Sequence, residues 1–383
     1  MILFWPSVHS LKKAGAVSKD EVAVVRRWYS TIKARRSAPS GKVASDQLGE
    51  IIAPDVEAPG EVGVVVIGRN EGQRLVDCLQ SLRPFIHRTV YVDSGSTDDS
   101  VAMAARAGAK VVALDMSIPF TAARARNEGV AAAIEAWPDI CFVQFVDGDC
   151  LVDENWIVTG VAFLAANRNA SVVSGHLRER FPERSVFNAL NDNDWQGGVA
   201  GQTTICGGNS LMRVQPFQHC GGYRSSLIAG EEPELCVRLR QAGGTVWQLD
   251  ADMVRHDSNM MHFGQWWRRC VRTGYAFAEV SYIHRGSALS PWRRSIIRSI
   301  FWAFALPLLA ISGALFVHPA LALLFALYPF QLVRLALRGG ISKRLAWQSS
   351  IFDLIGKFAE FRGIVKFCVN HIRKRNQKLI EYK

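Results

Sequence analysis

Short apolar runs alternate with helical patterns through the middle of the chain, and this alternation restricts the possible folds most strongly. The runs expected to form strands are residues 63–67, 89–92, 110–114 and 141–146. The segments expected to form helices are residues 73–82, 97–107, 121–136 and 154–167. Strands that alternate with helices of ten to fifteen residues build a parallel sheet. The sequence therefore predicts an α/β fold with a parallel sheet over residues 61–257.

Two carboxylates separated by one glycine, Asp147 and Asp149, follow the apolar run of residues 141–146. Open α/β sheets bind ligands at the carboxyl ends of their strands. Hard oxygen ligands at such a point suit Mg²⁺ or Mn²⁺, and the ion would in turn hold phosphate oxygens. The same triplet also forms ordinary turns, so by itself it leaves both interpretations open.

Polar side chains also follow the first two expected strands. Asn70 and Glu71 follow the first, and Asp93 and Ser94 follow the second. A carboxylate directly after a buried strand can accept hydrogen bonds from ribose hydroxyls or from a base N–H. The first strand is followed by neither G-x-G-x-x-G nor G-x-x-x-x-G-K-[ST], which argues against a dinucleotide fold and against a P-loop.

The net charge of +11 is concentrated at residues 12–42 and 293–383, a distribution that points to anionic lipid or nucleic acid. The basic residues flank apolar segments instead of an aromatic-bearing sheet face, so we expect membrane lipid and no nucleic acid as the partner. The eight cysteines include no C-x-x-C pair, and we expect reduced packing residues of a cytosolic domain. Residues 1–60 are expected to form a basic N-terminal extension and linker.

Residues 299–333 contain no Asp, Glu, Lys or Arg, a run of 35 residues. One membrane span needs about 20 residues, so this run is too long for one and barely enough for two. His318-Pro319 would make the turn, and both flanks are basic, which the positive-inside rule keeps in the cytoplasm. We expect a membrane hairpin of two hydrophobic helices over residues 286–340. A hairpin lying in the interface and a buried soluble helix pair remain alternatives.

Residues 341–383 show the pattern of a basic amphipathic helix on an anionic membrane surface. Its apolar positions, spaced by three or four, are Trp347, Ile351, Leu354, Phe358, Phe361, Val365 and Cys368. Lys and Arg lie between or beyond them. A core helix of the soluble domain is the competing interpretation.

Seven short motifs, taken together and in order, resemble glycosyltransferase family 2, the inverting enzymes of the GT-A fold. They are Arg69-Asn70-Glu71, Asp93-Ser-Gly-Ser-Thr-Asp98, Ala125-Arg126-Asn127, Asp147-Gly-Asp149, Gly207-Gly-Asn-Ser-Leu-Met-Arg213, Gly230-Glu-Glu-Pro-Glu-Leu235 and Gln265-Trp-Trp-Arg-Arg269. The resemblance covers about residues 61–280. It implies a GT-A catalytic domain over residues 61–285, with a Rossmann-like mixed sheet flanked by helices.

The resemblance also implies a nucleotide-sugar donor, for which a UDP-sugar is expected, and a bound Mn²⁺ or Mg²⁺. The expected nucleotide-binding residues are Asn70, Glu71, Asp93, Ser94, Arg126 and Asp147. The expected metal ligands are Asp149, assisted by Asp147, and His256. A lone histidine is more often a satisfied surface or core residue, and a solvated helix face is the alternative for Arg126.

Inverting transfer needs a carboxylate that removes a proton from the acceptor hydroxyl. Glu232, with Glu231 beside it, is the expected base, although the family usually has Glu-Asp here. Both side chains also suit the first turn of a helix for structural reasons. The expected sugar and acceptor residues are Gly208, Asn209, Gln265, Trp266, Trp267, Arg268 and Arg269. The alternatives are a membrane-proximal helix that packs the two tryptophans and a simple tight turn at the glycine.

These observations predict a metal-dependent, inverting glycosyltransferase at the cytoplasmic face of the inner membrane. Its acceptor is expected to be a lipid-linked or polysaccharide glycan, and one hydrophobic hairpin favours the addition of single sugars over a processive synthase. Two alternatives are a sugar-1-phosphate nucleotidyltransferase and a non-catalytic scaffold in a polysaccharide assembly complex.

Overall fold

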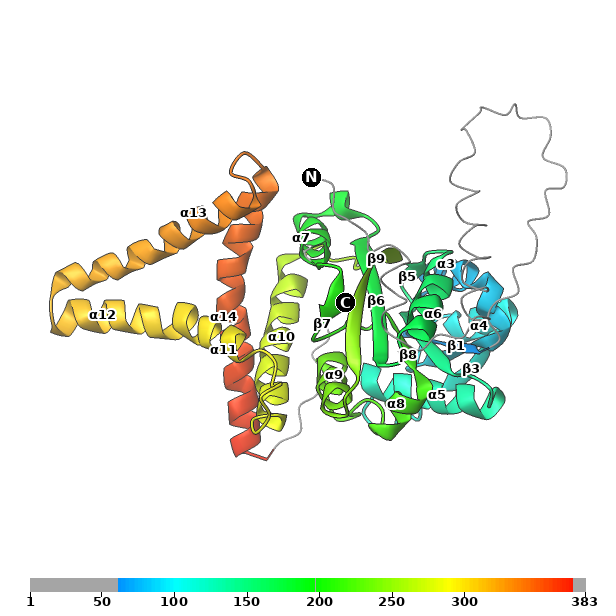
Figure 1. Ribbon diagram of the computed structural model, residues 1–383. Coiled ribbons are helices and arrows are strands. Elements are labelled where there is room, and N and C mark those ends of the chain that lie inside the picture. The colour runs from blue at the N-terminus through cyan, green and yellow to red at the C-terminus, as the bar shows by residue number, and fades with distance from the viewer. Residues whose placement is uncertain (1–60, 197, 375–383) are drawn as a thin grey trace, which may run out of the picture. The chain divides into compact units, whose positions relative to one another are not determined.

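Residues Glu57–Lys383 cluster as one compact unit, of which a computed structural model describes residues 61–196 and 198–374 (Figure 1). The strands are β1 (Val62–Gly68), β2 (Thr89–Asp93), β3 (Lys110–Ala113), β4 (Phe142–Asp147), β5 (Cys150–Val152), β6 (Ala170–Glu179), β7 (Gly201–Thr203), β8 (Ser210–Arg213) and β9 (Thr245–His256). The helices among them are α3 (Gln73–Ser81), α4 (Ser100–Ala107), α5 (Ala122–Ala136), α6 (Trp156–Ala166), α7 (Val186–Trp195), α8 (Val214–His219) and α9 (Glu231–Gln241), with short turns η1 (Arg83–Arg88) and η2 (Pro182–Arg184).

The strands form one mixed sheet in the order β3-β2-β1-β4-β8-β6-β9-β5, with β7 paired to β9. The expectation of a parallel sheet holds for β3, β2, β1 and β4, and β6 and β9 also pair in parallel. It is wrong at β8, which runs antiparallel to both β4 and β6, and at β5 and β7, which run antiparallel to β9. Parallel pairing requires a crossover connection such as a helix on the face of the sheet. The regular alternation of strands and helices ends at α6, and β8 enters the sheet from a loop. The mixed sheet implied by the resemblance is confirmed.

Alternate residues of the strands point to opposite faces of the sheet, as a period of two requires. Val64 and Val66 of β1 join the core under α3, α4 and α6, whereas Val65 joins the core under α5, α8 and α9. Helix α5 lies very close to the sheet at Gly129, where an added Cβ would come 2.3 Å from Val65 Cγ1. This close approach brings Arg126, one turn earlier on α5, toward the carboxyl end of the strands.

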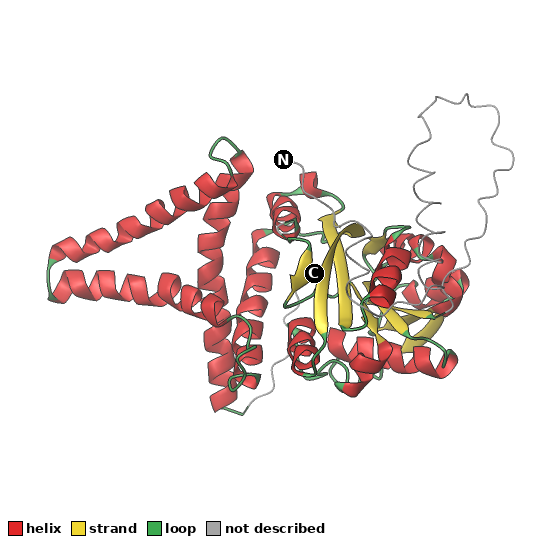
Figure 2. Ribbon diagram, in the orientation of Figure 1, coloured by secondary structure: helices red, strands yellow, loops and turns green. Residues whose placement is uncertain are grey.

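The C-terminal part is entirely helical (Figure 2). It comprises α10 (Phe263–Ile283), α11 (Arg293–Ile300), the π-helical η3 (Phe301–Ala305), α12 (Leu306–Phe316), η4 (Pro319–Ala326), α13 (Leu327–Gly339) and α14 (Arg344–Ile372). Residues Arg293–Phe316 and Pro319–Gly339 run as two long apolar helices of 24 and 21 residues, each long enough to cross a membrane by length and composition. The expected hydrophobic hairpin is therefore present, with its turn at His318.

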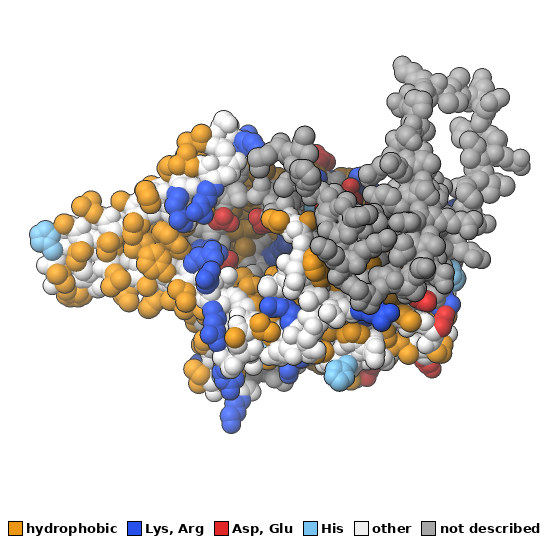
Figure 3. Space-filling view, viewed as in Figure 1, with side chains coloured by type: hydrophobic (Ala, Val, Ile, Leu, Met, Phe, Trp, Pro, Cys, Tyr) orange, Lys and Arg blue, Asp and Glu red, His pale blue; other side chains and the backbone are white. Residues whose placement is uncertain are grey.

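The hairpin is exposed instead of buried. Phe316 and Val317, at its tip, are 84% and 77% exposed, and hydrophobic side chains cover its surface in Figure 3. Trp302 and Tyr328 join its two arms with ring centroids 5.5 Å apart, and Phe304 stacks on Phe361 of α14. This exposure contradicts the alternative of a buried soluble helix pair.

Helix α14 packs on α10 through a face that the sequence pattern did not indicate. Small residues allow the contact: a Cβ on Gly274 of α10 would lie 2.0 Å from the carbonyl oxygen of Glu360, and one on Gly363 would lie 2.1 Å from that of Val271. The expected apolar stripe instead remains largely exposed, as at Ile351, Phe358 and Val365, although its member Leu354 is buried. One face of α14 thus belongs to a packed core, and the membrane-surface role of its exposed stripe stays a prediction.

The expected N-terminal extension and linker, residues 1–60, and the last nine residues of the C-terminal segment lie outside the described residues.

Candidate active site

Polar side chains gather at the carboxyl edge of the parallel strands. The register pairs Gly68 of β1 with Asp93 of β2, and Ile67 with Asp147 of β4, so the three strands end side by side. The segments that follow them carry the residues singled out from the sequence.

The loops after β1 and β2 are tied together. Asn70 adopts a left-handed backbone with φ of 56°, its N–H donates to Ser96 Oγ at 2.9 Å, and its Oδ1 accepts the N–H of Thr97 at 2.7 Å. Asp93 is buried, and its Oδ2 accepts the N–H groups of Gly95 and Ser96 at 3.0 and 2.9 Å. These bonds hold the loops in one conformation.

The other two residues expected to bind nucleotide lie at the same edge. Ser94 is buried and its N–H donates to the Gly68 carbonyl, continuing the ladder between β2 and β1. Glu71 forms an ion pair with Arg74 at 2.8 Å. All four expected residues from these loops are therefore neighbours along the ends of β1 and β2.

Arg126 is the centre of the site. Its side chain is only 3% exposed, and it binds three carboxylates from two other elements. Nη1 donates to Glu231 Oε1 at 2.9 Å and to Glu232 Oε1 at 3.0 Å, and Nη2 donates to Asp147 Oδ1 at 2.9 Å. The alternative of a solvated helix face is therefore wrong for Arg126.

The two glutamates reach Arg126 because α9 begins sharply. Gly230 has φ of 79°, a left-handed conformation that glycine adopts without strain, and the helix starts at the next residue. Pro233 lies in the first turn, as expected. Carboxylates in this turn are favoured by the helix dipole. Burial, with the adjacent Glu231, raises the pKa of Glu232 to about 7.

Gly208 and Asn209 pack against the same group. A Cβ at Gly208 would lie 2.3 Å from Arg126 Nη2 and 3.1 Å from Glu232 Oε1, so a larger residue would displace the guanidinium. Asn209 is buried, and its Oδ1 accepts the backbone N–H of Asp147 at 3.0 Å. Gly208 thus leaves room for the guanidinium of Arg126, and Asn209 holds the backbone of Asp147.

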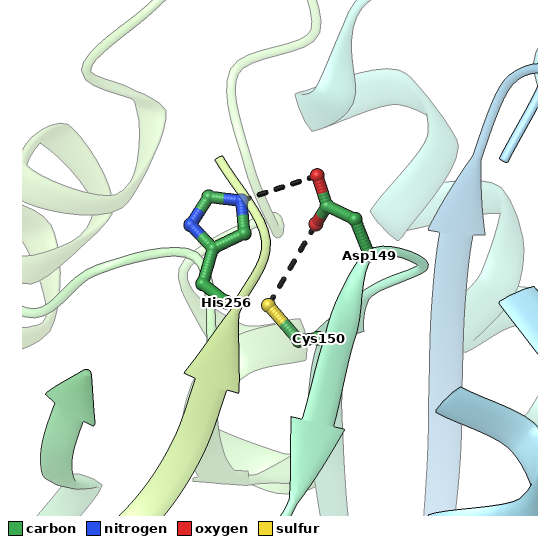
Figure 4. A group of neighbouring side chains, drawn as sticks. All are labelled: Asp149, Cys150 and His256. Carbon is green, nitrogen blue, oxygen red and sulfur yellow. Dashed lines mark hydrogen bonds and ion pairs between the residues drawn. The ribbon is translucent and has the colours of Figure 1, made fainter. Parts of the chain in front are cut away.

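A second corner of the site lies at the end of β9. The antiparallel register places Cys150 of β5 opposite His256, which brings Asp149 beside the imidazole. Asp149 Oδ2 lies 3.1 Å from His256 Nε2, and Cys150 Sγ lies 3.7 Å from Asp149 Oδ1 (Figure 4). One ligand atom from each residue lies within 4.8 Å of the others.

This corner fits a divalent ion. His256 Nε2 is buried without an aligned hydrogen-bond partner, and burial lowers the pKa of His256, so the imidazole is neutral at neutral pH. A neutral imidazole with a carboxylate suits Mn²⁺ better than Mg²⁺, which prefers oxygen ligands. Burial raises the pKa of the Cys150 thiol, which keeps it protonated and a poor ligand.

The residues of the Gln265-Trp-Trp-Arg-Arg269 motif separate into different environments. Gln265 caps α10, where its Oε1 accepts the N–H of Met261 and of His262 at 2.8 and 2.9 Å. Trp266 is buried between Phe187 and Phe352, with centroids 6.1 and 5.0 Å away. These two side chains support the fold.

The rest of the motif is more accessible. Trp267 packs on Phe263 with an angle of 35° between the rings, and Arg268 is exposed. Arg269 lies nearest the candidate metal corner: its guanidinium is 5.8 Å from the ring of Trp195, and that ring stacks on His256 at 5.2 Å.

Two contributors to the site were missed from the sequence. Trp195 covers His256, and nothing in its surroundings in the sequence distinguishes it. Tyr223 is buried with its ring 5.7 Å from the Arg126 guanidinium. Its backbone is held by Asn127, whose Oδ1 accepts the Tyr223 N–H at 2.9 Å. Asn127 belongs to the Ala-Arg-Asn motif, so the motif was the available signal for a loop that Asn127 holds, and Tyr223 lies in that loop.

Known proteins share this arrangement to different degrees. A family model described as Glycosyl transferase family 2 matches residues 63–221. The chain is 27% identical over 202 residues to the succinoglycan biosynthesis protein ExoA of Rhizobium meliloti, covering 49% of this chain and 60% of that protein. It is 26% identical over 256 residues to the pre-mycofactocin glycosyltransferase of Mycobacterium tuberculosis, covering 61% of this chain and 52% of the relative. The matches thus span roughly half the length of these curated relatives.

The fold is also that of a solved glycosyltransferase. The mannosyltransferase PcManGT from Pyrobaculum calidifontis, solved with GDP-Man and Mn²⁺, superposes with a TM-score of 0.56 and 18% identity. The superposition covers 94% of this chain and 97% of PcManGT, so the likeness of fold extends beyond the sheet domain. Residues 63–221 are therefore similar to glycosyl transferase family 2, and the chain has a GT-A-like fold.

Proposed function

We propose that this protein is an inverting, metal-dependent glycosyltransferase that moves a sugar from a nucleotide-sugar donor to an acceptor hydroxyl. One observation carries the proposal. Glu231, Glu232 and Asp147 converge on the buried Arg126, at the same sheet edge as Asp149 and His256. A general base, a charge-balancing cation and a candidate metal corner therefore occupy one edge, next to loops suited to a nucleoside.

The residues would divide the chemistry as follows. Asp93 and Glu71 would hold the nucleoside, and Asp149 with His256 would hold a divalent ion. That ion, when bound, supplies positive charge to the departing diphosphate. Glu232 would take the proton of the acceptor hydroxyl while its oxygen attacks the anomeric carbon from the face opposite the nucleotide, which inverts the configuration.

Arg126 would keep Glu232 in position and favour its ionised form. Burial and the charge of Glu231 oppose ionisation, whereas the guanidinium promotes it. The balance leaves a base with a pKa near neutrality, where proton transfer is most effective. Because Nη2 also holds Asp147, one side chain sets the position of the base relative to the strand that leads to Asp149.

The identity of the donor base is inferred only by analogy. The resemblance favours a UDP-sugar, whereas the PcManGT structure contains GDP-Man and Mn²⁺. Both observations support a nucleotide sugar as donor and Mn²⁺ or Mg²⁺ as the ion, with the histidine at the corner favouring Mn²⁺.

We further propose that the hairpin anchors the enzyme in the inner membrane with its catalytic domain in the cytoplasm. Exposed basic residues surround the roots of the hairpin and continue along α14, and Lys and Arg side chains line up there in Figure 3. They include Arg293, Arg294, Arg298, Arg334, Arg338, Arg344, Arg362 and Lys366. Basic flanks on both sides of a hydrophobic hairpin indicate a cytoplasmic location for both. A lipid-linked or polysaccharide acceptor is consistent with this site and with the name of the ExoA relative.

The proposal is tested by screening UDP-, GDP- and other nucleotide sugars with the purified full-length protein, with Mn²⁺, Mg²⁺ or a chelator present. We expect the protein to consume at least one donor, and that donor to raise the thermal midpoint of the protein. Both effects should depend on the ion. Asp149→Asn should abolish both effects, whereas Asp139→Asn, at the other end of β4, should not. A protein that neither binds nor consumes any nucleotide sugar would contradict the proposal.

A further inference from the structure

A cavity of about 190 Å³ lies between α7, α10 and α14, where the sheet domain meets the C-terminal helices. Its wall includes Asn191 and Asp194 from α7, Arg269 from α10 and Asp353 from α14. Arg269 Nη1 donates to Asn191 Oδ1 at 2.6 Å, and the same guanidinium lies against Trp195. Trp195 also stacks on His256, so a single ring lies between Arg269 of the cavity wall and the candidate metal corner.

The cavity carries an excess of negative charge. Glu360, also in its wall, is paired with Lys357 at 2.8 Å, but neither Asp194 nor Asp353 has a hydrogen-bond or ion-pair partner among the described residues. Both carboxyl groups are reached by solvent from the mouth of the cavity, yet partial burial raises the pKa of each, to about 6 for Asp194. At neutral pH Asp194 is thus mainly ionised and lacks a partner.

We propose that this cavity receives the acceptor, and that the reacting end of the acceptor is an uncharged sugar with a free hydroxyl instead of a lipid phosphate. Free carboxylates and an amide accept hydrogen bonds from sugar hydroxyls and repel a phosphate, which carries a charge of about −1.5 to −2 at neutral pH. The cavity lies between the donor edge and α14, the helix that carries the hairpin, so a glycan on a lipid would meet it on leaving the bilayer.

The base supports the same choice of acceptor. A hydroxyl must lose a proton as its oxygen bonds to the anomeric carbon, while the bond from that carbon to the diphosphate oxygen breaks and its electron pair leaves with the nucleotide. Glu232 accepts that proton. A phosphate oxygen is already ionised and needs no base, so a buried glutamate with a near-neutral pKa would serve no purpose with a phosphate acceptor.

This inference rests on the proposed function and is tested with the donor that the screen identifies. The probes are octyl glycosides of glucose, galactose, mannose and N-acetylglucosamine, with octyl phosphate as the anionic counterpart. We expect at least one glycoside to accelerate nucleotide release by the full-length protein and octyl phosphate not to do so. Asp194→Asn and Asp353→Asn should each raise the KM for that glycoside by about tenfold, with a much smaller change in the KM for the donor.

Asp139→Asn is the matched control, because it makes the same change at an exposed residue paired with Arg88. Asp353→Lys should in addition allow octyl phosphate to act. The inference is wrong, while the proposed function stands, if octyl phosphate accelerates nucleotide release by the wild-type protein as much as any glycoside does, or if no glycoside accelerates it. It is also wrong if both asparagine variants keep the wild-type KM for the glycoside. If no nucleotide sugar is consumed under any condition, the proposed function fails as well.

Discussion

The sheet domain and the hydrophobic hairpin distribute their side chains in opposite ways. In the sheet domain a charged group as large as Arg126 is 3% exposed and bonded to three carboxylates, and the valines of β1 are buried. In the hairpin Phe316 and Val317 are largely exposed, and residues 299–333 contain no Asp, Glu, Lys or Arg. The comparison teaches that the sheet domain buries its apolar side chains and pairs its buried charge, whereas the hairpin leaves its apolar side chains on the surface, as the proposed contact with lipid requires.

Direct packing links the two regions: α10 packs on α14, and α14 packs on the hairpin. Backbone contact at Gly274 and Gly363 brings these helices closer than larger residues would permit. Aromatic packing then links α14 to the hairpin through Phe361 and Phe304. The site is therefore held at a fixed distance from the surface that would meet the membrane.

The largest effect is expected from removing the carboxylate of Glu232, the proposed base in the sheet domain. Glu232→Gln keeps the shape of the side chain but removes the base, and turnover should fall by about 10²–10⁴-fold. Single-turnover nucleotide release measures it. Glu234→Gln makes the same change two residues away at a residue bonded to Arg238 and His284, so it should lower the thermal midpoint with a much smaller loss of turnover. Equal losses in both variants would argue against a base at Glu232.

Removing the positive charge of Arg126 should have the next largest effect, a loss of folding stability. Arg126→Gln leaves Asp147, Glu231 and Glu232 together without a positive charge, and breaking a buried ion pair typically costs about 3–5 kcal/mol. Denaturant unfolding should therefore show a free energy of unfolding lower by roughly that amount. Arg106→Gln, on the exposed face of α4, is the control and should change the free energy by less than about 0.5 kcal/mol. Equal stability of the two variants would show that the charges around Arg126 are compensated in another way.

The hairpin can be tested with the same type of substitution in both regions. Leu309→Asp places a carboxylate on the exposed surface of α12, at a cost of about 3 kcal/mol if that surface lies in lipid. We expect a lower membrane-bound fraction after an alkaline wash of cell membranes. Val101→Asp makes the matching change at an exposed apolar residue of α4 and should leave that fraction unchanged. If Leu309→Asp is retained as well as wild type, this face of α12 does not contact lipid.

The smallest effect expected is a dependence of turnover on pH. Glu232 must be ionised to accept a proton, and its pKa is about 7, so turnover should rise with pH and level off above neutrality. One unit below the pKa, only about a tenth of the base is ionised. The rise should be absent in Glu232→Gln. A flat wild-type profile between pH 5 and 8, of the kind that an unperturbed carboxylate with a pKa of about 4.3 would give, would contradict the burial of this group.

The sequence predicted the parallel half of the sheet well, because apolar runs and helices alternate there and polar residues mark the strand ends. It also predicted that Asp147, Arg126 and the two glutamates belong to one site, through motifs more than 80 residues apart. It failed where partners come from tertiary packing. The antiparallel strand β8 enters the sheet from a loop, between β4 and β6, and Trp195 has no motif.

The helices show the same limit. The spacing of apolar residues predicts the stripe that includes Ile351 and Val365, but the face of α14 that packs on α10 combines small residues with Ile364 and Phe367. Glycines such as Gly363 carry no hydrophobic signal. Their role is visible only in the packed structure, where a Cβ on Gly363 would lie 2.1 Å from the carbonyl oxygen of Val271. A spacing of small residues on both helices was the available clue.

The most direct test of the central claim is proton NMR of the first product formed from a donor that the protein consumes in the presence of Mn²⁺. Attack from the face opposite the nucleotide, assisted by Glu232, predicts that the transferred sugar has the anomeric configuration opposite to that of the donor. Retention of the donor configuration would contradict the account, since it would require a covalent intermediate or attack from the same face.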